Sequence, residues 1–97
     1  MQVLFSEYAR QELLDAIEYY EHEYLGLGKQ FEAEARKTVL RIVEYPEAGS
    51  VVRGDVRQSL LSKFPYKLLY AIEKEHIIII AVAHQHRRPD YWIDRNK

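Results

Sequence analysis

Apolar residues in the first part of the chain recur at helical spacing. Four of them lie three or four positions apart and so share one helical face: Leu13, Ile17, Tyr20 and Tyr24. Ser6 stands before them where a helix N-cap belongs, and the residues before Ser6 resemble a short strand. We therefore predict a strand over residues 2–5 and a helix that begins after Ser6 and ends near Leu25.

A second stripe with the same period follows a short connection. Its members are Phe31, Ala35, Val39 and Ile42. This stripe predicts a helix over residues 29–44, which Pro46 ends because proline cannot continue the hydrogen-bond ladder of a helix. Gly26 and Gly28 give the connection a permissive backbone, so the two helices should form an antiparallel hairpin.

After Pro46 the apolar period changes to two, which is typical of strands. Residues 51–61 predict a strand that is interrupted at Gly54-Asp55 by a turn or a bulge. Residues 66–72 alternate cleanly and predict the next strand. Residues 76–84 contain four consecutive isoleucines, so we expect an interior strand that is covered on both faces.

The predicted order is therefore β-α-α-β-β-β in a single α+β domain spanning residues 1–97. The helical hairpin should cover one face of a small, largely antiparallel sheet. No segment of the sequence looks long enough to cover the other face. We expect that face to be open or to be occupied by a partner.

Composition narrows the function classes. The chain has no cysteine, which excludes disulfides, thiolate metal sites and cysteine nucleophiles. Its longest apolar run, Ile77–Ala83, has seven residues, whereas a membrane-spanning helix needs about 20. The start of the chain lacks a basic, signal-like segment, so a cytoplasmic location is expected. Residues 1–50 carry a net charge of −5 and residues 51–97 a net charge of +4. The basic half could contact an acidic partner or nucleic acid, or the two halves could neutralise each other.

The polar residues at the end of the last predicted strand are the main candidates for chemistry. His84 and His86 are two positions apart, so both rings should lie on one face of the strand. They could bind a metal with Asp90, move a proton, or simply hydrogen-bond at the end of the strand. Because a metal site needs three or four converging donors, the sequence predicts no metal and no cofactor.

Cationic and aromatic residues extend this cluster. Arg87 and Arg88 could join other bases in a concave phosphate-binding surface, or pair with acids of the helical hairpin. The other bases of such a surface would be Arg57, Lys63 and Lys67. Most tyrosines follow apolar stripes and predict core packing: Tyr20, Tyr24, Tyr66 and Tyr70. Tyr91 is the candidate site tyrosine, and Trp92 is better suited to anchoring the chain end on the core.

Two segments of the chain resemble a known family. Residues 64–70 (FPYKLLY) and residues 80–92 (IAVAHQHRRPDYW) are similar to the RelE/ParE toxins of bacterial type II toxin–antitoxin systems. The element order agrees, and the resemblance covers essentially the whole chain. It implies a small cytoplasmic toxin, of the kind also called a plasmid stabilization protein. It also implies a cognate antitoxin, encoded next to it, whose tail wraps around the toxin.

The resemblance implies two different targets. ParE-type toxins poison DNA gyrase, and the target-binding residues would then be His86, Arg87, Arg88, Tyr91 and Trp92. RelE-type toxins cut messenger RNA in the ribosome, and the catalytic residues would then be Arg57, His84, Arg87 and Tyr91. The Tyr-Trp ending and the pI near 6.4 favour the ParE branch, because a nuclease that enters ribosomal RNA is usually strongly basic. A third hypothesis is an inactive module that only binds the antitoxin, so the sequence leaves open whether the chain is an enzyme.

Overall fold

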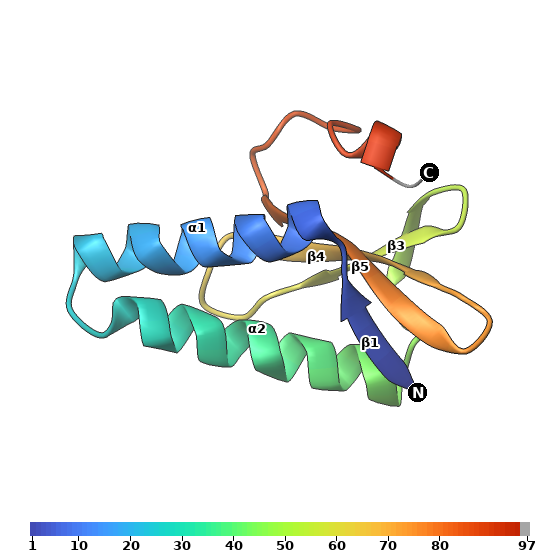
Figure 1. Cartoon of the computed structure of the whole chain (residues 1–97), viewed down its shortest axis with the longest axis horizontal. Coiled ribbons are helices and arrows are strands. Elements are labelled where there is room, and N and C mark those ends of the chain that lie inside the picture. Colours follow the sequence, from blue (N-terminus) through green and yellow to red (C-terminus); the bar gives the residue numbers. More distant parts are fainter. Residues whose placement is uncertain (96–97) are drawn as a thin grey trace.

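The computed structural model describes residues 1–95, and Figure 1 shows its arrangement. The elements in chain order are β1 (Gln2–Phe5), α1 (Glu7–Glu23), α2 (Leu27–Glu44), β2 (Ser50–Arg53), β3 (Val56–Leu60), β4 (Tyr66–Ile72), β5 (His76–His84) and a short 3-10 turn (Ile93–Arg95). The predicted α+β architecture is confirmed, with two helices packed on one face of the sheet. Neither helix of this described part is long and apolar enough to cross a membrane.

Side chains at the helix ends fix the hairpin. Ser6 caps α1 as predicted, because its hydroxyl accepts a hydrogen bond from the Ala9 N–H at 3.1 Å. The Glu21 carboxylate accepts hydrogen bonds from the N–H groups of Gly26 and Gly28, at 2.9 and 3.0 Å. A side chain at Gly28 would place its Cβ 2.5 Å from the carbonyl oxygen of Ile17, so only glycine lets the two helices approach this closely. Helix α2 begins at Leu27, two residues before the predicted start, with Gly26 as its N-cap.

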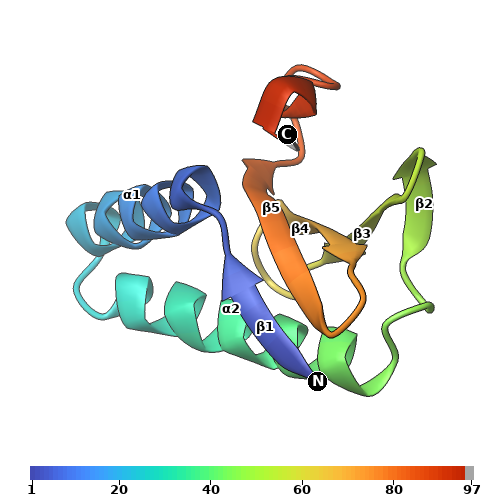
Figure 2. The ribbon, with the colours of Figure 1, turned by 45° about the vertical axis from the view of Figure 1, so that its right-hand side comes forward.

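The sheet has five strands in the order β1-β5-β4-β3-β2. β1 runs parallel to β5, and all other neighbours are antiparallel, so the sheet is largely antiparallel as predicted. Figure 2 shows both helices on one side of this sheet, with β2 at the far edge. The nine-residue strand β5 lies between β1 and β4, which confirms its predicted interior position.

The prediction of one interrupted strand over residues 51–61 was wrong in detail. This stretch forms two strands, β2 and β3, which pair antiparallel across a tight turn at Gly54-Asp55. The backbone of Gly54 has a φ of +53°, a conformation that the turn requires and that glycine adopts without strain. The interruption is thus a full reversal, and four strands instead of three follow the helices.

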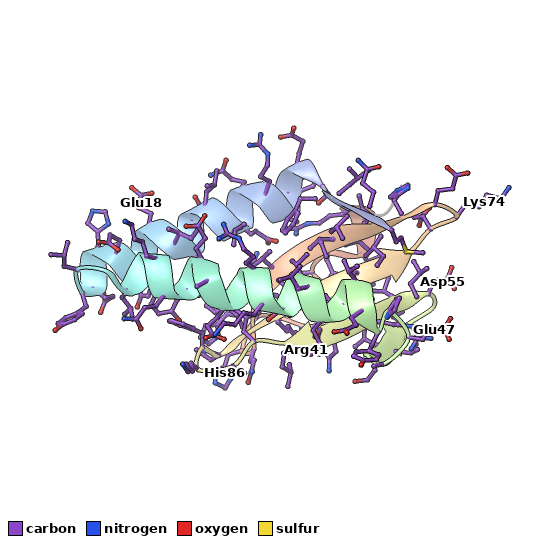
Figure 3. All side chains as sticks on the ribbon, turned by 90° about the horizontal axis from the view of Figure 1, so that it is seen from below. Glu18, Arg41, Glu47, Asp55, Lys74 and His86 are labelled. Carbon is purple, nitrogen blue, oxygen red and sulfur yellow. The ribbon has the colours of Figure 1, made fainter. Side chains whose placement is uncertain are left out.

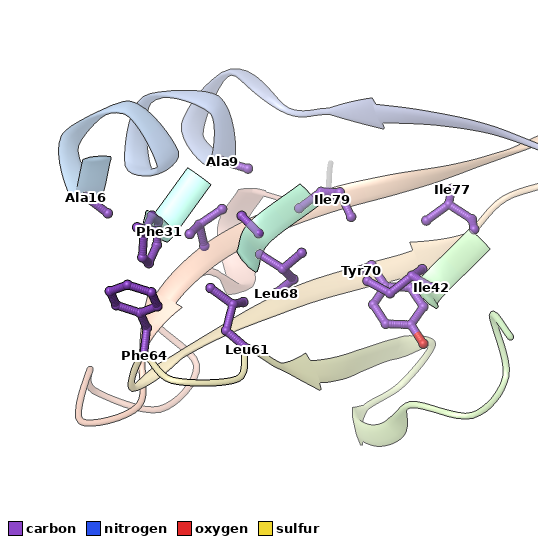
Figure 4. Close-up of a cluster of buried hydrophobic side chains, with 12 residues drawn as sticks. Ala9, Ala16, Phe31, Ile42, Leu61, Phe64, Leu68, Tyr70, Ile77 and Ile79 are labelled. Atoms are coloured by element: carbon purple, nitrogen blue, oxygen red, sulfur yellow. The ribbon is translucent and has the colours of Figure 1, made fainter. Parts of the chain in front are cut away.

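The face of the sheet beneath the helices carries the larger core (Figure 4). Aromatic rings fill the end of this core near α1, where the ring centre of Phe31 lies 5.2 Å from that of Tyr20 and 5.1 Å from that of Phe64. Tyr70 is fully buried at the other end of this core, beside Ile42 and Ile77, in agreement with the prediction of core packing (Figure 4). The prediction for Tyr24 was wrong, because α1 ends at Glu23 and Tyr24 continues as an extended residue that is 72% exposed.

A β-bulge creates the smaller core on the opposite face of the sheet. Leu69 pairs with Ala81 but the next residue, Tyr70, pairs with Ile79, which leaves Ile80 as an extra residue in β5. Ile80 and Ala81 therefore both pack away from the helices. The buried residues of this second cluster are Val56, Leu69, Ala71, Ile80, Ala81 and Trp92.

Trp92 brings the end of the chain onto this second face. The residues after β5 fold back and bury the Trp92 side chain to 6% exposure, as an anchor should. The expectation that no segment of the chain covers the second face was therefore wrong for this part of the sheet. The segment is short, but one large aromatic side chain covers much apolar surface.

Candidate functional site

The candidate site lies along the part of β5 that β1 does not reach. β1 ends at Phe5 opposite Ile79, so the following residues of β5 have no strand partner on that edge. Side chains of the first helix region replace the missing strand. The Ser6 hydroxyl donates to the carbonyl oxygen of Ile80 at 3.2 Å, and the Val82 N–H donates to the Glu12 carboxylate at 2.9 Å.

Glu12 joins this edge to the end of the chain. Its carboxylate also accepts hydrogen bonds from the Tyr91 hydroxyl at 2.8 Å and from both terminal nitrogens of Arg95 at 2.9 Å each. The Glu12 and Arg95 side chains are only 16% and 13% exposed, so this two-pronged ion pair lies largely out of water. Glu12 thus accepts four hydrogen bonds from three residues that lie 70 to 83 positions away in the sequence.

Two guanidinium groups lie against the Tyr91 ring. The Arg87 guanidinium carbon is 3.9 Å from the centre of the Tyr91 ring, and that of Arg95 is 4.7 Å from it. Burial raises the pKa of the Tyr91 hydroxyl, and its hydrogen bond to the Glu12 carboxylate raises this pKa further. The hydroxyl therefore keeps its proton and serves to tie the segment to Glu12.

A shallow cavity of about 210 Å³ lies on the second face of the sheet beside this segment. Its lining includes three cations, Lys67 from β4 and Arg87 and Arg88 from the chain after β5. The one acid in the lining, Asp90, pairs with Arg53 at 3.3 Å. The remaining lining is mostly apolar: Val52, Leu69, Ala83, Pro89, Tyr91 and Trp92.

His84 and His86 lie together on the other side of the segment, toward α1. The rings are 5.3 Å apart, and the His86 backbone N–H donates to Nδ1 of His84 at 3.0 Å. The two rings therefore lie close together, although His86 belongs to the turn after β5 and not to the strand on which it was predicted. His84 also contacts the Tyr66 ring at 5.2 Å and lines a cleft of about 290 Å³ that includes Asp15. Within residues 1–95 no group of three or more His, Asp or Glu side chains is placed to hold a metal ion.

Arg57 lies away from this cluster. Its guanidinium donates to the carbonyl oxygens of Glu47 and Gly49, at 2.9 and 2.8 Å, and so holds the loop before β2. Arg57 pairs with Tyr70 across the sheet, whereas His84 pairs with Tyr66, four residues along β4. Four residues of strand correspond to roughly 13 Å.

The predicted residues therefore fall into separate groups. Lys63 contacts Glu34 of α2 at 3.7 Å, so neither Lys63 nor Arg57 joins Lys67 in one concave basic surface. The structure brings together His84, His86, Arg87, Tyr91 and, across the segment, Arg88 and Trp92. The nuclease set is not assembled as a whole, because Arg57 is held elsewhere.

Most of the chain matches one known protein family. The family described as the ParE toxin of type II toxin–antitoxin systems, parDE, matches residues 3–89. The chain belongs to the ParE toxin family. This confirms the predicted resemblance and assigns the chain to the toxins of type II systems.

A solved structure agrees with the ParE fold. The chain superposes with a TM-score of 0.68 on a structure described as the chromosomal ParDE TA system from P. aeruginosa, at 19% sequence identity. The superposition covers 87% of this chain and 95% of that one. No curated protein sequence matches the chain significantly. The family match ends at residue 89, so Tyr91, Trp92 and Arg95 of this ParE chain lie beyond it.

Two residues of the site were missed in the sequence. Glu12 lies off the apolar stripe of α1, where a carboxylate normally faces water, and Arg95 sits near the chain end without a motif. No local pattern links residues so far apart. The only available signal was chemical, because a chain end that contains several arginines needs a counter-charge if it packs on the domain.

Proposed function

We propose that this ParE-family chain is a toxin that acts in the cytoplasm by binding DNA gyrase, and that a cognate antitoxin neutralises it. The family assignment supports a toxin. The observation that carries the choice of target is the ordered chain after β5. It presents cationic and aromatic side chains as a binding surface, and the residues needed for RNA cleavage are not assembled around it.

Two arginines form the centre of the proposed gyrase-binding surface. Within residues 1–95 neither Arg87 nor Arg88 forms an ion pair, so both guanidinium groups are available to a partner. Arg87 is stacked on the Tyr91 ring, and the Tyr91 hydroxyl is itself held by its hydrogen bond to Glu12. A side chain that is already held in its bound position loses less entropy on association, which favours binding.

Messenger RNA cleavage is the alternative function, and the geometry gives it less support. A ribonuclease of this kind needs cations at the scissile phosphate and a group that transfers a proton. Arg57 donates to loop carbonyls, and the raised pKa of Tyr91 keeps its hydroxyl protonated. The cleft beside His84 also includes Asp15, whose negative charge disfavours a phosphate backbone.

The surface left for an antitoxin includes the outer edge of the sheet. All four residues of β2 are exposed, and Val51 and Val52 are 56% and 40% exposed despite being apolar. An edge strand with apolar side chains can accept an extended peptide through main-chain hydrogen bonds. Binding of this kind would also serve an inactive module, so neutralisation and toxicity need separate tests.

The decisive experiment is a short induction in a bacterial host, combined with a gyrase assay on the purified chain. We expect growth arrest without new RNA 5′ ends, and inhibition of gyrase supercoiling in vitro. The double variant Arg87→Ala with Arg88→Ala should keep its far-ultraviolet dichroism and lose most of its potency. The matched control Arg36→Ala with Lys74→Ala removes two positive charges elsewhere and should remain toxic.

Each other outcome selects a different function. New cuts within codons that vanish when translation is blocked would establish the ribosome-dependent nuclease instead. Absence of growth arrest, with antitoxin binding retained, would identify an inactive binding module. If the arginine double variant were as toxic as the unaltered protein, the chain after β5 would have no part in binding the target.

A further inference from the structure

We propose that the cavity on the second face of the sheet is a binding site for a carboxylate side chain of an acidic peptide segment in the toxin's target. The inference rests on the proposed function in one respect, since it takes the target to be a protein. It adds the chemistry of the contact, namely an acidic residue next to an apolar one. The cavity volume of about 210 Å³ suits one or two side chains.

Charge around the cavity favours an anion. Lys67, Arg87 and Arg88 come from two segments of the chain and converge on this one cavity. The only acid in the lining is Asp90, and Arg53 offsets its charge at 3.3 Å. A carboxylate entering the cavity would therefore meet an excess of positive charge and N–H donors that can bind it in pairs.

The floor of the cavity adds an apolar requirement. Leu69 and Ala83 of the sheet form part of this floor. Trp92 packs against the sheet beside them, and only 6% of the Trp92 surface is exposed. An apolar floor excludes water and strengthens the attraction between a carboxylate and the surrounding cations. A ligand that combines an acidic and an apolar side chain satisfies both parts of the lining.

The same features argue for a peptide over nucleic acid. Non-specific nucleic-acid binding depends on neutralising a row of phosphates and on exposed aromatic rings that stack with bases. This cavity has three cations, and its tryptophan is buried as a floor. Asp15 lines the cleft on the other side of Arg87, where a continuing phosphate backbone would meet its negative charge.

Glu12 is the positioning residue of this cavity. It does not line the cavity, but it holds Tyr91 and Arg95, and Tyr91 carries the stacked Arg87. The wall of the cavity is thus fixed from α1, on the opposite face of the sheet. A rigid wall lets the cations bind a carboxylate without first being ordered.

The chain carries a built-in reporter for a binding test. Trp92 is the only tryptophan and forms part of the floor, so its fluorescence responds to a ligand in the cavity. The probe is an acetylated, amidated hexapeptide that alternates leucine and glutamate, with a leucine–glutamine peptide as its neutral counterpart and a 12-nucleotide single-stranded DNA as the third ligand. We expect the glutamate peptide to bind, with an affinity that falls at least tenfold in the variant Lys67→Gln with Arg88→Gln.

The matched control changes the same charge elsewhere. Arg36→Gln with Lys74→Gln removes one arginine and one lysine, and should bind the peptide like the unaltered protein. Arg36 lies on α2 and pairs with Glu32, and Figure 3 shows Lys74 at the end of the molecule away from His86. An equal loss of affinity in both double variants would mean that net charge alone attracts the peptide, and would overturn the proposal.

Three further outcomes would also overturn it. These are no binding of the glutamate peptide at millimolar concentration, equal binding of the glutamine peptide, or tighter binding of the DNA. The gyrase assay separates this result from the proposed function. If the chain inhibited gyrase but did not bind the peptide, the proposed carboxylate site would be overturned, and gyrase would remain the proposed target.

Discussion

The two faces of the sheet are held in different ways. The face under the helices is closed by apolar contacts from α1, α2 and three strands, with rings packed around Phe31 at about 5 Å. The opposite face is closed by one large side chain, Trp92, on the segment that Glu12 holds through Tyr91 and Arg95. The first face depends on many apolar contacts, whereas the second depends on a smaller cluster around Trp92 and on the Glu12 carboxylate that holds its segment.

This difference assigns different roles to the two faces. Burial of one large apolar side chain stabilises a domain by about 1.5–3 kcal/mol, so the many side chains under the helices provide most of the folding energy. The second face contributes less to folding, yet it carries the cavity and the proposed binding surface. Substitutions on the second face can therefore alter binding, while the core under the helices keeps the protein folded.

The largest effect should come from a charge on the helix-covered face. Ile79 is fully buried and pairs with Tyr70 in the middle of the sheet. Ile79→Asp would place a carboxylate there without a partner, and we expect a loss of at least about 5 kcal/mol, enough to prevent folding. Circular dichroism and a thermal melt test this, and a soluble product with a cooperative melt would contradict it.

The neighbouring residue gives the matched comparison. Ile78 lies next to Ile79 in β5 but packs on the second face and is only half-buried. Ile78→Asp can turn its carboxylate toward water, so we expect a loss of about 1–2 kcal/mol and a folded protein. If both variants failed to fold, the two faces would not differ in the way described.

An intermediate effect should follow removal of the Glu12 charge. Glu12→Gln keeps the shape of the side chain but leaves the Arg95 guanidinium without its counter-charge. We expect a loss of about 2 kcal/mol, limited because the segment can move into water and hydrate its arginines. Trp92 fluorescence should shift to longer wavelength as the ring leaves the sheet, while the helical dichroism stays unchanged.

A second ion pair on the same segment provides the control. Arg53 and Asp90 are 60% and 47% exposed, and a single contact at 3.3 Å joins them. Asp90→Asn should cost less than about 0.5 kcal/mol and leave Trp92 in place, because exposed pairs contribute little. Asparagine also tolerates the positive φ of 66° at this position. An equal fluorescence shift in both variants would show that Glu12 has no special role.

The elements of the fold were predictable because each follows from a local pattern. The four-residue stripes gave both helices, and the isoleucine run of residues 76–84 gave β5 with its bounds. The hairpin at Gly54-Asp55 was missed because two residues of turn between two short apolar runs also fit a bulge. Tyr24 was misplaced because the stripe continues for one residue beyond the point where α1 ends.

The site was predictable only in part. A cluster of polar residues after a buried strand was recognisable from the sequence, and the structure brings His84, Arg87 and Tyr91 close together there. The separation of Arg57 depends on carbonyl groups of the loop before β2, which no side-chain pattern encodes. The link from Glu12 to Tyr91 spans 79 positions, so it depends on where the finished sheet places β5 beside α1.

The last effect concerns the Tyr91 hydroxyl and appears fully only in alkali. Burial and the Glu12 hydrogen bond raise the pKa of Tyr91 above the ordinary value of about 10, so the folded protein holds this proton more tightly than the unfolded chain. The resulting stabilisation is complete below about pH 10 and is lost as the pH rises from there toward the folded-state pKa. A guanidinium group keeps its charge over this range, so the Tyr91 hydroxyl is the group that titrates in its contact with Glu12 and Arg95.

Tyr91→Phe separates this contribution from that of the other buried tyrosines. Burial also raises the pKa of Tyr20, Tyr66 and Tyr70, so alkali weakens the helix-covered face as well. The variant loses one hydrogen bond, which costs about 1 kcal/mol near pH 7. As the pH rises from about 10, the Trp92 signal of this variant should change less than that of the unaltered protein, because no proton need be lost at position 91. Identical alkaline transitions of Trp92 in the two proteins would mean that the segment detaches only when the helix-covered face itself unfolds.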